Sequence, residues 1–241
     1  YTVFTFTPDG RSLVFIGMRD GVLRLYVRAL DGEEARVLEG TEDADAPAVS
    51  ADGQWVAFCS KGAIRRIPIV GGPTSTLVDS VSPGSSMAWG RDGRLFYSDA
   101  TLIYSVTPEH PPTTVTKHVP RGGIERSDEE HLFPHLLPDG RALLYTVIRG
   151  AGKPGDVETV AHVFATGEIK LLLKDAIDAR YVASGHLVFM RRNTLMAVDF
   201  DLARLKVLGT PIPVLGDVAQ LLNFADQEVQ TLGRAISGRE L

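Results

Sequence analysis

The sequence predicts an all-β protein, a β-propeller of four-stranded antiparallel blades, on three observations. A phrase centred on Asp-Gly recurs as TPDGRSLVF, SADGQWVAF, GRDGRLFY and LPDGRALLY, and more weakly as SGHLVF and ISGREL. Its glycines are 43, 40, 47, 45 and 53 residues apart: Gly10, Gly53, Gly93, Gly140, Gly185 and Gly238. Short apolar runs separated by turn residues fill each interval. A repeat of this length, made of short strands, is typical of propeller blades.

The Asp-Gly dipeptide has a physical reason to mark the turn between the first two strands of each repeat. Proline sets φ early in a type I turn, and glycine accepts the left-handed conformation that follows. In the second repeat the first strand ends at 48–49 and the turn occupies 51–53. The remaining strands of that repeat are 54–59, 63–70 and 74–78, with a Gly71-Gly72 turn before the last.

The five repeats cover 1–40, 41–80, 81–118, 119–176 and 177–218. Repeats 1, 3, 4 and 5 have apolar strand positions in the same order as the second. These positions are 14–15, 23–27 and 37–38; then 95–97, 102–104 and 114–115; then 143–145, 160–164 and 169–173; then 187–189, 195–200 and 212–215.

One further strand, Arg234–Leu241, within a partial repeat at 219–241, resembles the first strand of a sixth blade. The sequence therefore predicts a six-bladed plan with five complete repeats, in a single domain over 1–241. We expect this chain to be a fragment, or its last blade to be completed elsewhere. An incomplete blade has an unpaired edge, so an open ring or self-association through that edge is expected.

Composition and charge exclude several classes of protein. The 25 basic and 30 acidic residues give a net charge of −5, whereas a general nucleic-acid binder needs a basic surface. The single Cys59 excludes an intramolecular disulfide. No apolar run approaches the roughly 18 residues of a transmembrane helix, so we expect no membrane insertion by this segment. The chain opens on a strand, and any export signal would lie outside it.

Several longer segments resemble a known family. TPDGRSLVF, SADGQWVAF, AIRRIPIVGGP, HLFPHLLPDGRALLY and VLGTPIPVLGDV are similar to TolB-like propellers of the WD-like bacterial kind. The resemblance is greatest to those found C-terminal to the kinase domain in bacterial serine/threonine protein kinases, and it covers essentially the whole chain. It implies a sensor or protein-interaction role without catalytic residues. The compartment would be periplasmic or extracytoplasmic for a kinase sensor domain, and cytoplasmic otherwise. The chain has no kinase motif of its own.

No residue is assigned a catalytic role, and no metal site is predicted. The run Gly84-Ser85-Ser86-Met87-Ala88 lacks the last glycine of a serine-hydrolase elbow. His131 and His135 have the spacing of two metal ligands on a helix, but Pro134 interrupts it. Aligning the repeats places both histidines in a first strand, where they would point to the same face. A structural or channel-lining role is therefore favoured over metal binding.

The predicted ligand site is the mouth of the central channel. It lies on the face that carries the loops between the second and third strands of each repeat and the connectors between repeats. Acids from the connectors and bases from the loops would suit a protein, a peptide or a small polar ligand. No cofactor is predicted. Calcium bound among the acids is a weaker alternative, because the D-x-D-x-D-G spacing of a calcium loop is absent. The candidate residues are Asp43, Asp45, Ser85, His131, Arg19 and Arg191.

The predicted function is a non-catalytic module for protein or ligand binding, the sensor or interaction part of a larger bacterial signalling protein. Two alternatives remain open: a lactonase-like, metal-dependent propeller hydrolase, and the lid propeller of a prolyl-oligopeptidase-type serine peptidase. The first needs an asparagine near the channel, whereas Asn193 and Asn223 both fall outside the first strands. Aromatic residues near the turns are expected to pack between blades: Phe15, Trp55, Phe58, Trp89, Phe96, Tyr145 and Phe189.

Overall fold

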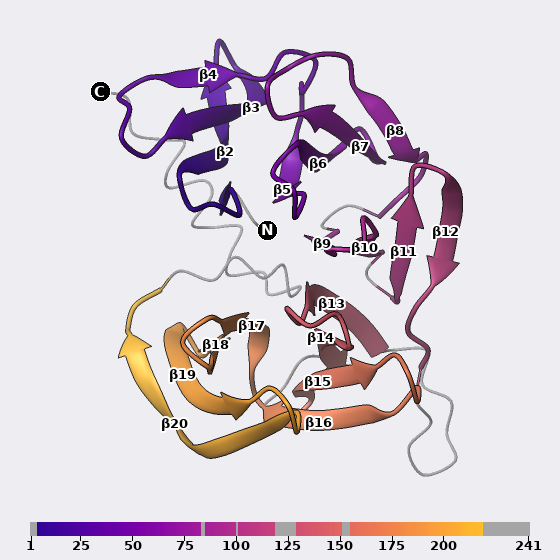
Figure 1. The fold of residues 1–241 in the computed structure, drawn as a ribbon, viewed down its shortest axis with the longest axis vertical. Helices are drawn as coiled ribbons and strands as arrows, with labels where there is room; N and C mark the ends of the chain where they lie inside the picture. Colours follow the sequence, from indigo (N-terminus) through magenta and orange to yellow (C-terminus); the bar gives the residue numbers. More distant parts are fainter. Residues whose placement is uncertain (1–3, 83–84, 100, 119–128, 151–154, 219–241) are drawn as a thin grey trace.

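The computed structural model of the protein describes residues 4–82, 85–99, 101–118, 129–150 and 155–218 (Figure 1). In these residues twenty β-strands form five four-stranded antiparallel sheets, which lie around a common centre as the blades of a propeller. The predicted all-β fold and the four-stranded antiparallel blades are confirmed. The structure has five blades and not the predicted six, because the strands between residues 4 and 215 complete five sheets. The strand expected at 234–241 lies outside the described residues.

Each blade is a meander of four consecutive strands, here called A to D. Blade 1 contains β1 (Phe4–Phe6), β2 (Ser12–Arg19), β3 (Val22–Ala29) and β4 (Ala35–Val37). Blade 2 contains β5 (Asp45–Val49), β6 (Trp55–Ser60), β7 (Ala63–Pro68) and β8 (Ser75–Val78). Blade 3 contains β9 (Met87–Trp89), β10 (Leu95–Ser98), β11 (Ile103–Thr107) and β12 (His110–Thr114). Blade 4 contains β13 (Glu129–Leu136), β14 (Ala142–Arg149), β15 (Val157–Val163) and β16 (Ile169–Lys174). Blade 5 contains β17 (Ile177–Val182), β18 (His186–Arg191), β19 (Thr194–Asp201) and β20 (Lys206–Leu215).

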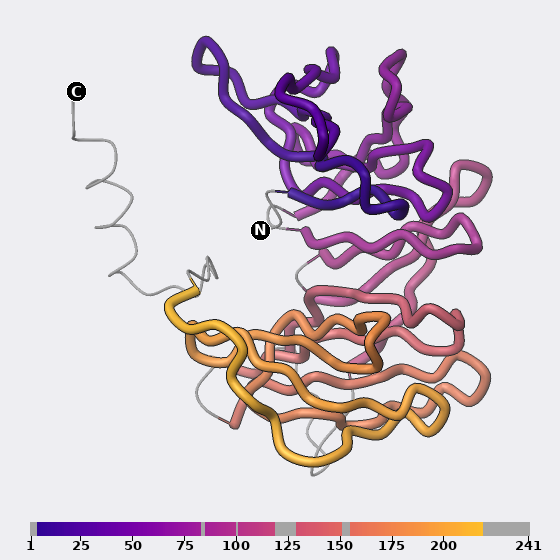
Figure 2. The backbone as a smooth tube through the Cα atoms, turned by 60° about the vertical axis from the view of Figure 1, so that its left-hand side comes forward, coloured from indigo at the N-terminus to yellow at the C-terminus, as the bar shows by residue number. Residues whose placement is uncertain are grey.

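Strand A of each blade lies near the centre and strand D lies at the periphery (Figure 1). The A strands contact one another in sequence order, from β1 through β5, β9 and β13 to β17. Figure 2 shows blade 1 (indigo) and blade 5 (orange to yellow) at opposite ends of this series. The meander places the A–B and C–D turns on one side of the ring, the turn face. The B–C loops and the D–A connectors lie on the other side, the connector face.

The four Asp-Gly phrases and the weaker Ser184-Gly185 phrase form the A–B turns, as predicted. Their glycines have φ values of 68, 71, 82, 69 and 86°, at Gly10, Gly53, Gly93, Gly140 and Gly185. The aspartate Oδ1 accepts the backbone N–H two residues later, as from Arg11 to Asp9 (3.0 Å). The Thr7 hydroxyl also donates to Asp9 (2.6 Å). The phrase therefore recurs because each of its positions stabilises the same turn.

Each blade has two faces with apolar side chains, because side chains alternate along its strands. The leading face points to the preceding blade and the trailing face to the following one. One pattern repeats at the four junctions: Val14 with Val56 and Phe58, Ala57 with Leu95 and Tyr97, Phe96 with Leu143 and Tyr145, and Leu144 with Leu187 and Phe189. These side chains are at most 4 % exposed. The predicted packing of aromatic residues between blades is therefore correct for Phe58, Phe96, Tyr145 and Phe189.

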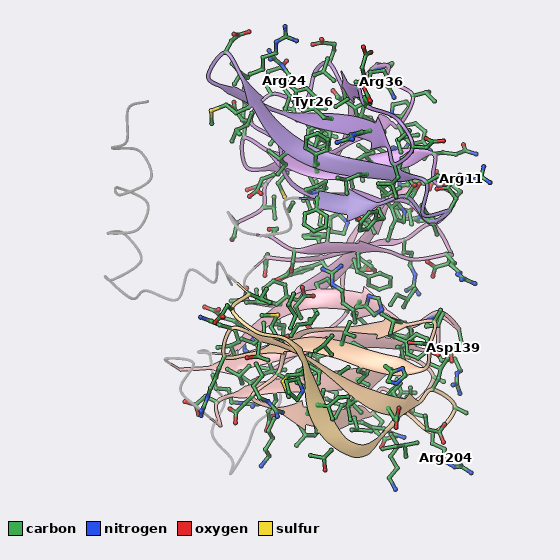
Figure 3. The ribbon with its side chains drawn as sticks, turned by 90° about the vertical axis from the view of Figure 1, so that its left-hand side faces the viewer. Arg11, Arg24, Tyr26, Arg36, Asp139 and Arg204 are labelled. Carbon is green, nitrogen blue, oxygen red and sulfur yellow. The ribbon has the colours of Figure 1, made fainter. Side chains whose placement is uncertain are left out.

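Two sheet faces stay uncovered within the described part of the chain, the leading face of blade 1 and the trailing face of blade 5. On blade 1, Phe15 stacks on Tyr26 with ring centroids 5.6 Å apart. Beside them Phe4 and Phe6 are 51 % and 53 % exposed. On blade 5 the exposed apolar side chains are aliphatic, namely Leu208, Ile212 and Leu215, and the exposed Asp199 lies among them beside Leu208. Figure 3 views the molecule from the side on which these two sheets lie, with Tyr26 labelled on blade 1.

The difference between covered and uncovered faces predicts unequal effects of the same substitution. Phe96→Ala removes a ring that is 0 % exposed between blades 3 and 4, so the free energy of unfolding should fall by about 3–5 kcal/mol. Phe6→Ala removes a half-exposed ring and should lower it by less than about 1 kcal/mol. Urea unfolding measures both losses. Equal losses would show that the junction of blades 3 and 4 is not a packed core.

Candidate functional site

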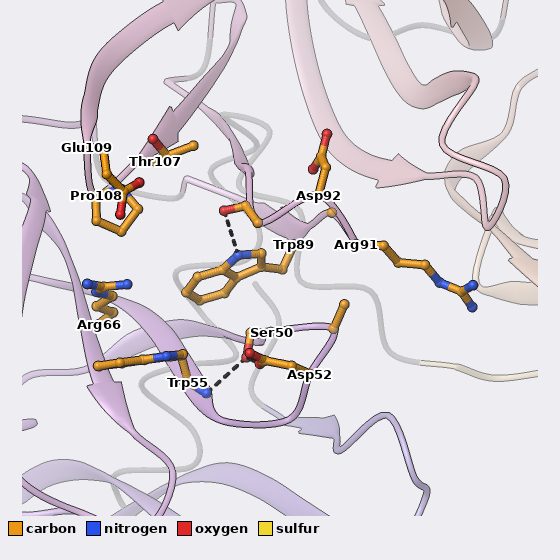
Figure 4. Close-up of a pocket in the computed structure, with 13 residues that line it drawn as sticks. Ser50, Asp52, Trp55, Arg66, Trp89, Arg91, Asp92, Thr107, Pro108 and Glu109 are labelled. Atoms are coloured by element: carbon orange, nitrogen blue, oxygen red, sulfur yellow. Dashed lines mark hydrogen bonds between the residues drawn. The ribbon is translucent and has the colours of Figure 1, made fainter.

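A cleft opens on the turn face where blades 2 and 3 meet, and we call it cleft 2/3 (Figure 4). It encloses about 270 Å³ and is lined by residues 50–52, 55, 66, 89–93 and 107–109. These residues belong to strand ends, to the A–B turns of both blades and to the C–D turn of blade 3. The cleft thus begins where the packed core between the two blades ends.

Trp55 and Arg66 form one wall of cleft 2/3. Trp55 begins β6, and alternation places it on the trailing face of blade 2 with Ala57. Its backbone N–H donates to Ser50 Oγ (2.9 Å). The Arg66 guanidinium lies 4.2 Å from the centroid of the indole ring, and Arg66 Nε donates to Ser75 Oγ (3.1 Å). The attraction between the cation and the ring fixes the two side chains as one unit.

Trp89 forms the opposite wall. It pairs with Leu95 on the leading face of blade 3, and its indole N–H donates to the carbonyl oxygen of Gly93 (3.2 Å; Figure 4). A Cβ on the next residue, Gly90, would lie 2.5 Å from Asp92 Oδ1 and 3.3 Å from the Arg94 carbonyl oxygen. A side chain at this point of the A–B turn would therefore require the Asp92 carboxylate to move.

Charged side chains form the rim of cleft 2/3. Hydrogen bonds from the Ser50 hydroxyl and the Gln54 N–H lower the pKa of Asp52 below its ordinary value. Asp52 is therefore a carboxylate at neutral pH. Asp92 and Glu109 add two further carboxylates from the A–B and C–D turns of blade 3, whereas the Arg91 side chain extends away from the two indoles (Figure 4).

A related cleft lies one blade earlier on the same face, at the junction of blades 1 and 2, and we call it cleft 1/2. It encloses about 540 Å³ and is lined by residues 7–9, 12, 27, 36, 51–53 and 69–70. Equivalent turns and strand ends of the repeat build both clefts, and Ser12 takes the place of Trp55. Because Ala51 and Asp52 line both clefts, the A–B turn of blade 2 is a ridge between them.

The residues predicted from the sequence to surround the channel mouth come from the connector face, at the other end of the strands. Asp43 Oδ2 lies 3.8 Å from Lys61 Nζ, and both side chains are exposed. Asp45 begins β5, and its Oδ1 accepts the next backbone N–H (2.7 Å). Ser85 is buried and donates to the Ser82 carbonyl oxygen (2.7 Å). Each side chain is thus engaged locally.

The two predicted arginines also have local partners. Arg19 is exposed, with its Nε 4.0 Å from Asp20 Oδ2. Arg191 donates to the carbonyl oxygens of Lys174 (2.9 Å) and Asp175 (3.2 Å), which ties blade 5 to the D–A connector before it. All six predicted residues are among those described, and no hydrogen bond or ion pair joins any two of them.

His131 is 1 % exposed and belongs to a buried polar network of blade 4. Its Nδ1 lies 2.8 Å from Thr116 Oγ1. In the same network Arg149 donates to Glu129 (2.6 Å) and to Glu158 (2.8 Å). Burial lowers the pKa of His131, and the Glu129 carboxylate offsets only part of this shift. The imidazole is therefore neutral at pH 7. The structure therefore encloses His131 between blades 3 and 4.

His131 and His135 point to opposite faces of blade 4, so the expectation that they share a face is wrong. A β-bulge lies between Leu132 and His135, and Phe133 within it has a φ of 55°. A bulge adds one residue to one strand of a pair, which reverses the alternation beyond it. His135 consequently faces blade 5, where its Nε2 accepts the backbone N–H of Tyr181 (3.1 Å).

Sequence reasoning missed Trp55 and Trp89 as site residues, because aromatic residues beside the turns were all expected to pack between blades. Trp55 follows the turn glycine Gly53 by two residues, whereas the buried Phe58 follows it by five. That offset was the available signal, since it puts Trp55 at the end of the strand. Phe15 is also an exception, since it lies on the uncovered face of blade 1.

The described residues contain neither a metal-binding cluster nor a membrane-spanning helix. No group of three or more His, Cys, Asp and Glu side chains among them is placed to hold a metal ion. No helix in the described parts of the chain has the length and apolar character to cross a membrane.

No family model matches this chain. An uncharacterized protein of Agrobacterium fabrum is 34 % identical over 79 residues, which are 31 % of this chain and 27 % of that protein. TolB from Acinetobacter baumannii has a TM-score of 0.66 and 14 % identity, over 89 % of this chain and 54 % of its own. A putative TolB from Agrobacterium tumefaciens also has a TM-score of 0.66, with 16 % identity over 88 % of this chain and 79 % of its own. This chain thus spans about half of the first TolB structure.

Similar structures with other names show how widely this fold is used. A nidogen/laminin complex has a TM-score of 0.62 at 13 % identity, over 86 % of this chain and 77 % of its own. An oligogalacturonate lyase of Vibrio parahaemolyticus has a TM-score of 0.58 at 9 % identity, over 93 % of this chain and 68 % of its own. A prolyl endopeptidase also has a TM-score of 0.58, at 15 % identity, over 89 % of this chain and 35 % of its own. These matches show a TolB-like β-propeller fold and leave the activity open.

Titration of His135 is expected to weaken the protein in mild acid. Burial lowers the pKa of His135 from 6.5 to about 4. The positive charge of Arg180 lowers it further, and the negative charge of Asp178 partly offsets the shift. The unfolded chain therefore binds more protons than the native state between these values. The free energy of unfolding should fall as the pH drops through this range. His135→Gln should make the slope shallower by up to about 1.4 kcal/mol per pH unit.

Urea unfolding across this pH range measures the slope. His110→Gln, in the exposed strand β12, is the control and should behave like the unmodified protein. Parallel slopes for the unmodified protein and His135→Gln would contradict the prediction.

Proposed function

We propose that this chain is a non-catalytic β-propeller module that binds a segment of another protein in cleft 2/3. In the whole protein it would be the sensor or interaction part of a bacterial signalling protein. The resemblance of its sequence to kinase-linked propellers supports that role. Any catalytic step would then belong to a different part of that protein.

The chemistry of the cleft walls carries this proposal. Tryptophan and arginine are among the residue types that dominate the energetics of protein interfaces, and Trp55, Trp89 and Arg66 all line this one cleft. The hydrogen bonds and the cation–π contact described above hold each of them before any ligand arrives. Because these side chains are already ordered, binding costs little further conformational entropy.

The size of the cleft suits the side chains of a polypeptide. Cleft 2/3 encloses about 270 Å³, which is close to the lower limit of roughly 300 Å³ for pockets that enclose whole small molecules. That volume accommodates one or two side chains of a ligand whose main chain runs outside. Asp52 and Glu109 on the rim can accept hydrogen bonds from such a chain, and Arg66 can donate to its carbonyl groups.

Peptides selected by the folded protein from a displayed random library should bind through cleft 2/3. Trp55→Ala is expected to weaken binding about 30-fold and Arg66→Gln at least about tenfold, because each removes a pre-ordered wall. Fluorescence anisotropy of labelled peptides measures the dissociation constants, and thermal unfolding verifies that the variants fold.

Arg19→Ala and Asp43→Ala, on the connector face, are the controls and should leave the affinity unchanged. Loss of binding in these two variants, with full affinity in Trp55→Ala, would place the site on the connector face.

A further inference from the structure

Cleft 1/2 offers an apolar anchor site beside cleft 2/3. Val27 and Ile69 line it, and Val70 at its rim is 80 % exposed. Arg36 donates to the carbonyl oxygens of Ile69 (2.7 Å) and Val70 (3.3 Å). These two bonds bind the C–D turn of blade 2 to β4 of blade 1, so they hold Val70 in place. An exposed valine fixed at the rim of a cleft is suited to contact an apolar side chain of a ligand.

The ridge between the two clefts carries a carboxylate. Both described hydrogen bonds to Asp52, from the Ser50 hydroxyl and the Gln54 N–H, go to Oδ1. Within the described part of the chain no basic side chain forms an ion pair with Asp52, which is exposed. The charge of Asp52 is thus presented outward between an aromatic cleft and an aliphatic one.

We infer that the two clefts act as one bipartite site for an extended polypeptide with a basic residue between two apolar anchors. One anchor lies between Trp55 and Trp89, the other lies against Val27 and Val70, and the lysine or arginine between them pairs with Asp52. This inference rests on the proposed function of cleft 2/3, and it adds the second cleft and the class of ligand.

The repeat geometry favours an extended chain over a compact ligand. Successive blades place equivalent clefts on the same face, and repeat proteins use such series to bind extended segments. A ligand that fills both clefts must cross the A–B turn of blade 2, where Asp52 lies. A lysine or arginine at the crossing would form a charge-assisted hydrogen bond with its carboxylate.

The test uses the peptides selected on the unmodified protein and two pairs of variants. Asp52→Asn keeps the Oδ1 acceptor of the turn, and Asp139→Asn makes the same change in the A–B turn of blade 4, outside both clefts. Val70→Asp changes the rim of cleft 1/2. Met18→Asp changes another exposed apolar side chain, on β2, outside the lining of either cleft.

We expect about tenfold weaker binding for Asp52→Asn and for Val70→Asp, and unchanged binding for the two controls. The loss in Asp52→Asn should disappear when the basic residue of the peptide is replaced by alanine, because the two changes remove the same interaction. Added salt should weaken binding to the unmodified protein more than binding to Asp52→Asn.

The outcomes separate the two proposals. If Trp55→Ala weakens binding but Asp52→Asn and Val70→Asp do not, the bipartite site is wrong and the proposed function of cleft 2/3 stands. If none of these three variants weakens binding, the proposed function fails as well. Selection of peptides without a basic residue, bound with full affinity by Asp52→Asn, would also overturn the inference.

Discussion

The contacts between blades depend on the alternation of side chains along strand B. In β6, Val56 and Phe58 face blade 1 while Ala57 faces blade 3, so one strand contributes to two cores. A slip of one residue would exchange these sets, so that Val56 and Phe58 would face blade 3 and Ala57 would face blade 1. The A–B turn prevents such a slip, because its aspartate and glycine hold the two strands in one register. The recurring phrase and the recurring core therefore have the same cause.

Because that cause is local, much of the fold could be predicted from the sequence. The order of strands in blade 2 follows from the Asp-Gly turn, the Gly71-Gly72 turn and the apolar runs between them. Equivalent bulges lie in β5 and β17, where Ala46 and Asp178 have a positive φ. The bulge in β13 could not be predicted, because no glycine marks its positive-φ position. There Phe133 takes a positive φ while its backbone N–H bonds to Ser86 Oγ of the preceding blade (2.8 Å). The orientation of His135 follows from this bulge.

The candidate site was less predictable for a similar reason. Whether a tryptophan is buried or lines a cleft depends on where the junction between two blades ends. Trp89 packs against the core of its junction and also lines cleft 2/3. Arg191 lies at the end of β18 on the connector face, as expected, but its partners are backbone carbonyl groups. Sequence spacing gives the position of a charge and leaves its partner undetermined.

Within the described part of the chain, the leading face of blade 1 and the trailing face of blade 5 are uncovered, which has a consequence for the colloidal behaviour of the molecule. One is aromatic, around Phe15 and Tyr26, and the other is aliphatic, around Ile212. Attraction between apolar surfaces weakens on cooling and strengthens in sulfate or phosphate salts. The net charge of −5 opposes such attraction only at short range, because the Debye length is about 8 Å at physiological ionic strength. Solubility should therefore be greatest in cold buffers of low ionic strength, with these two sheets as the places where molecules first adhere.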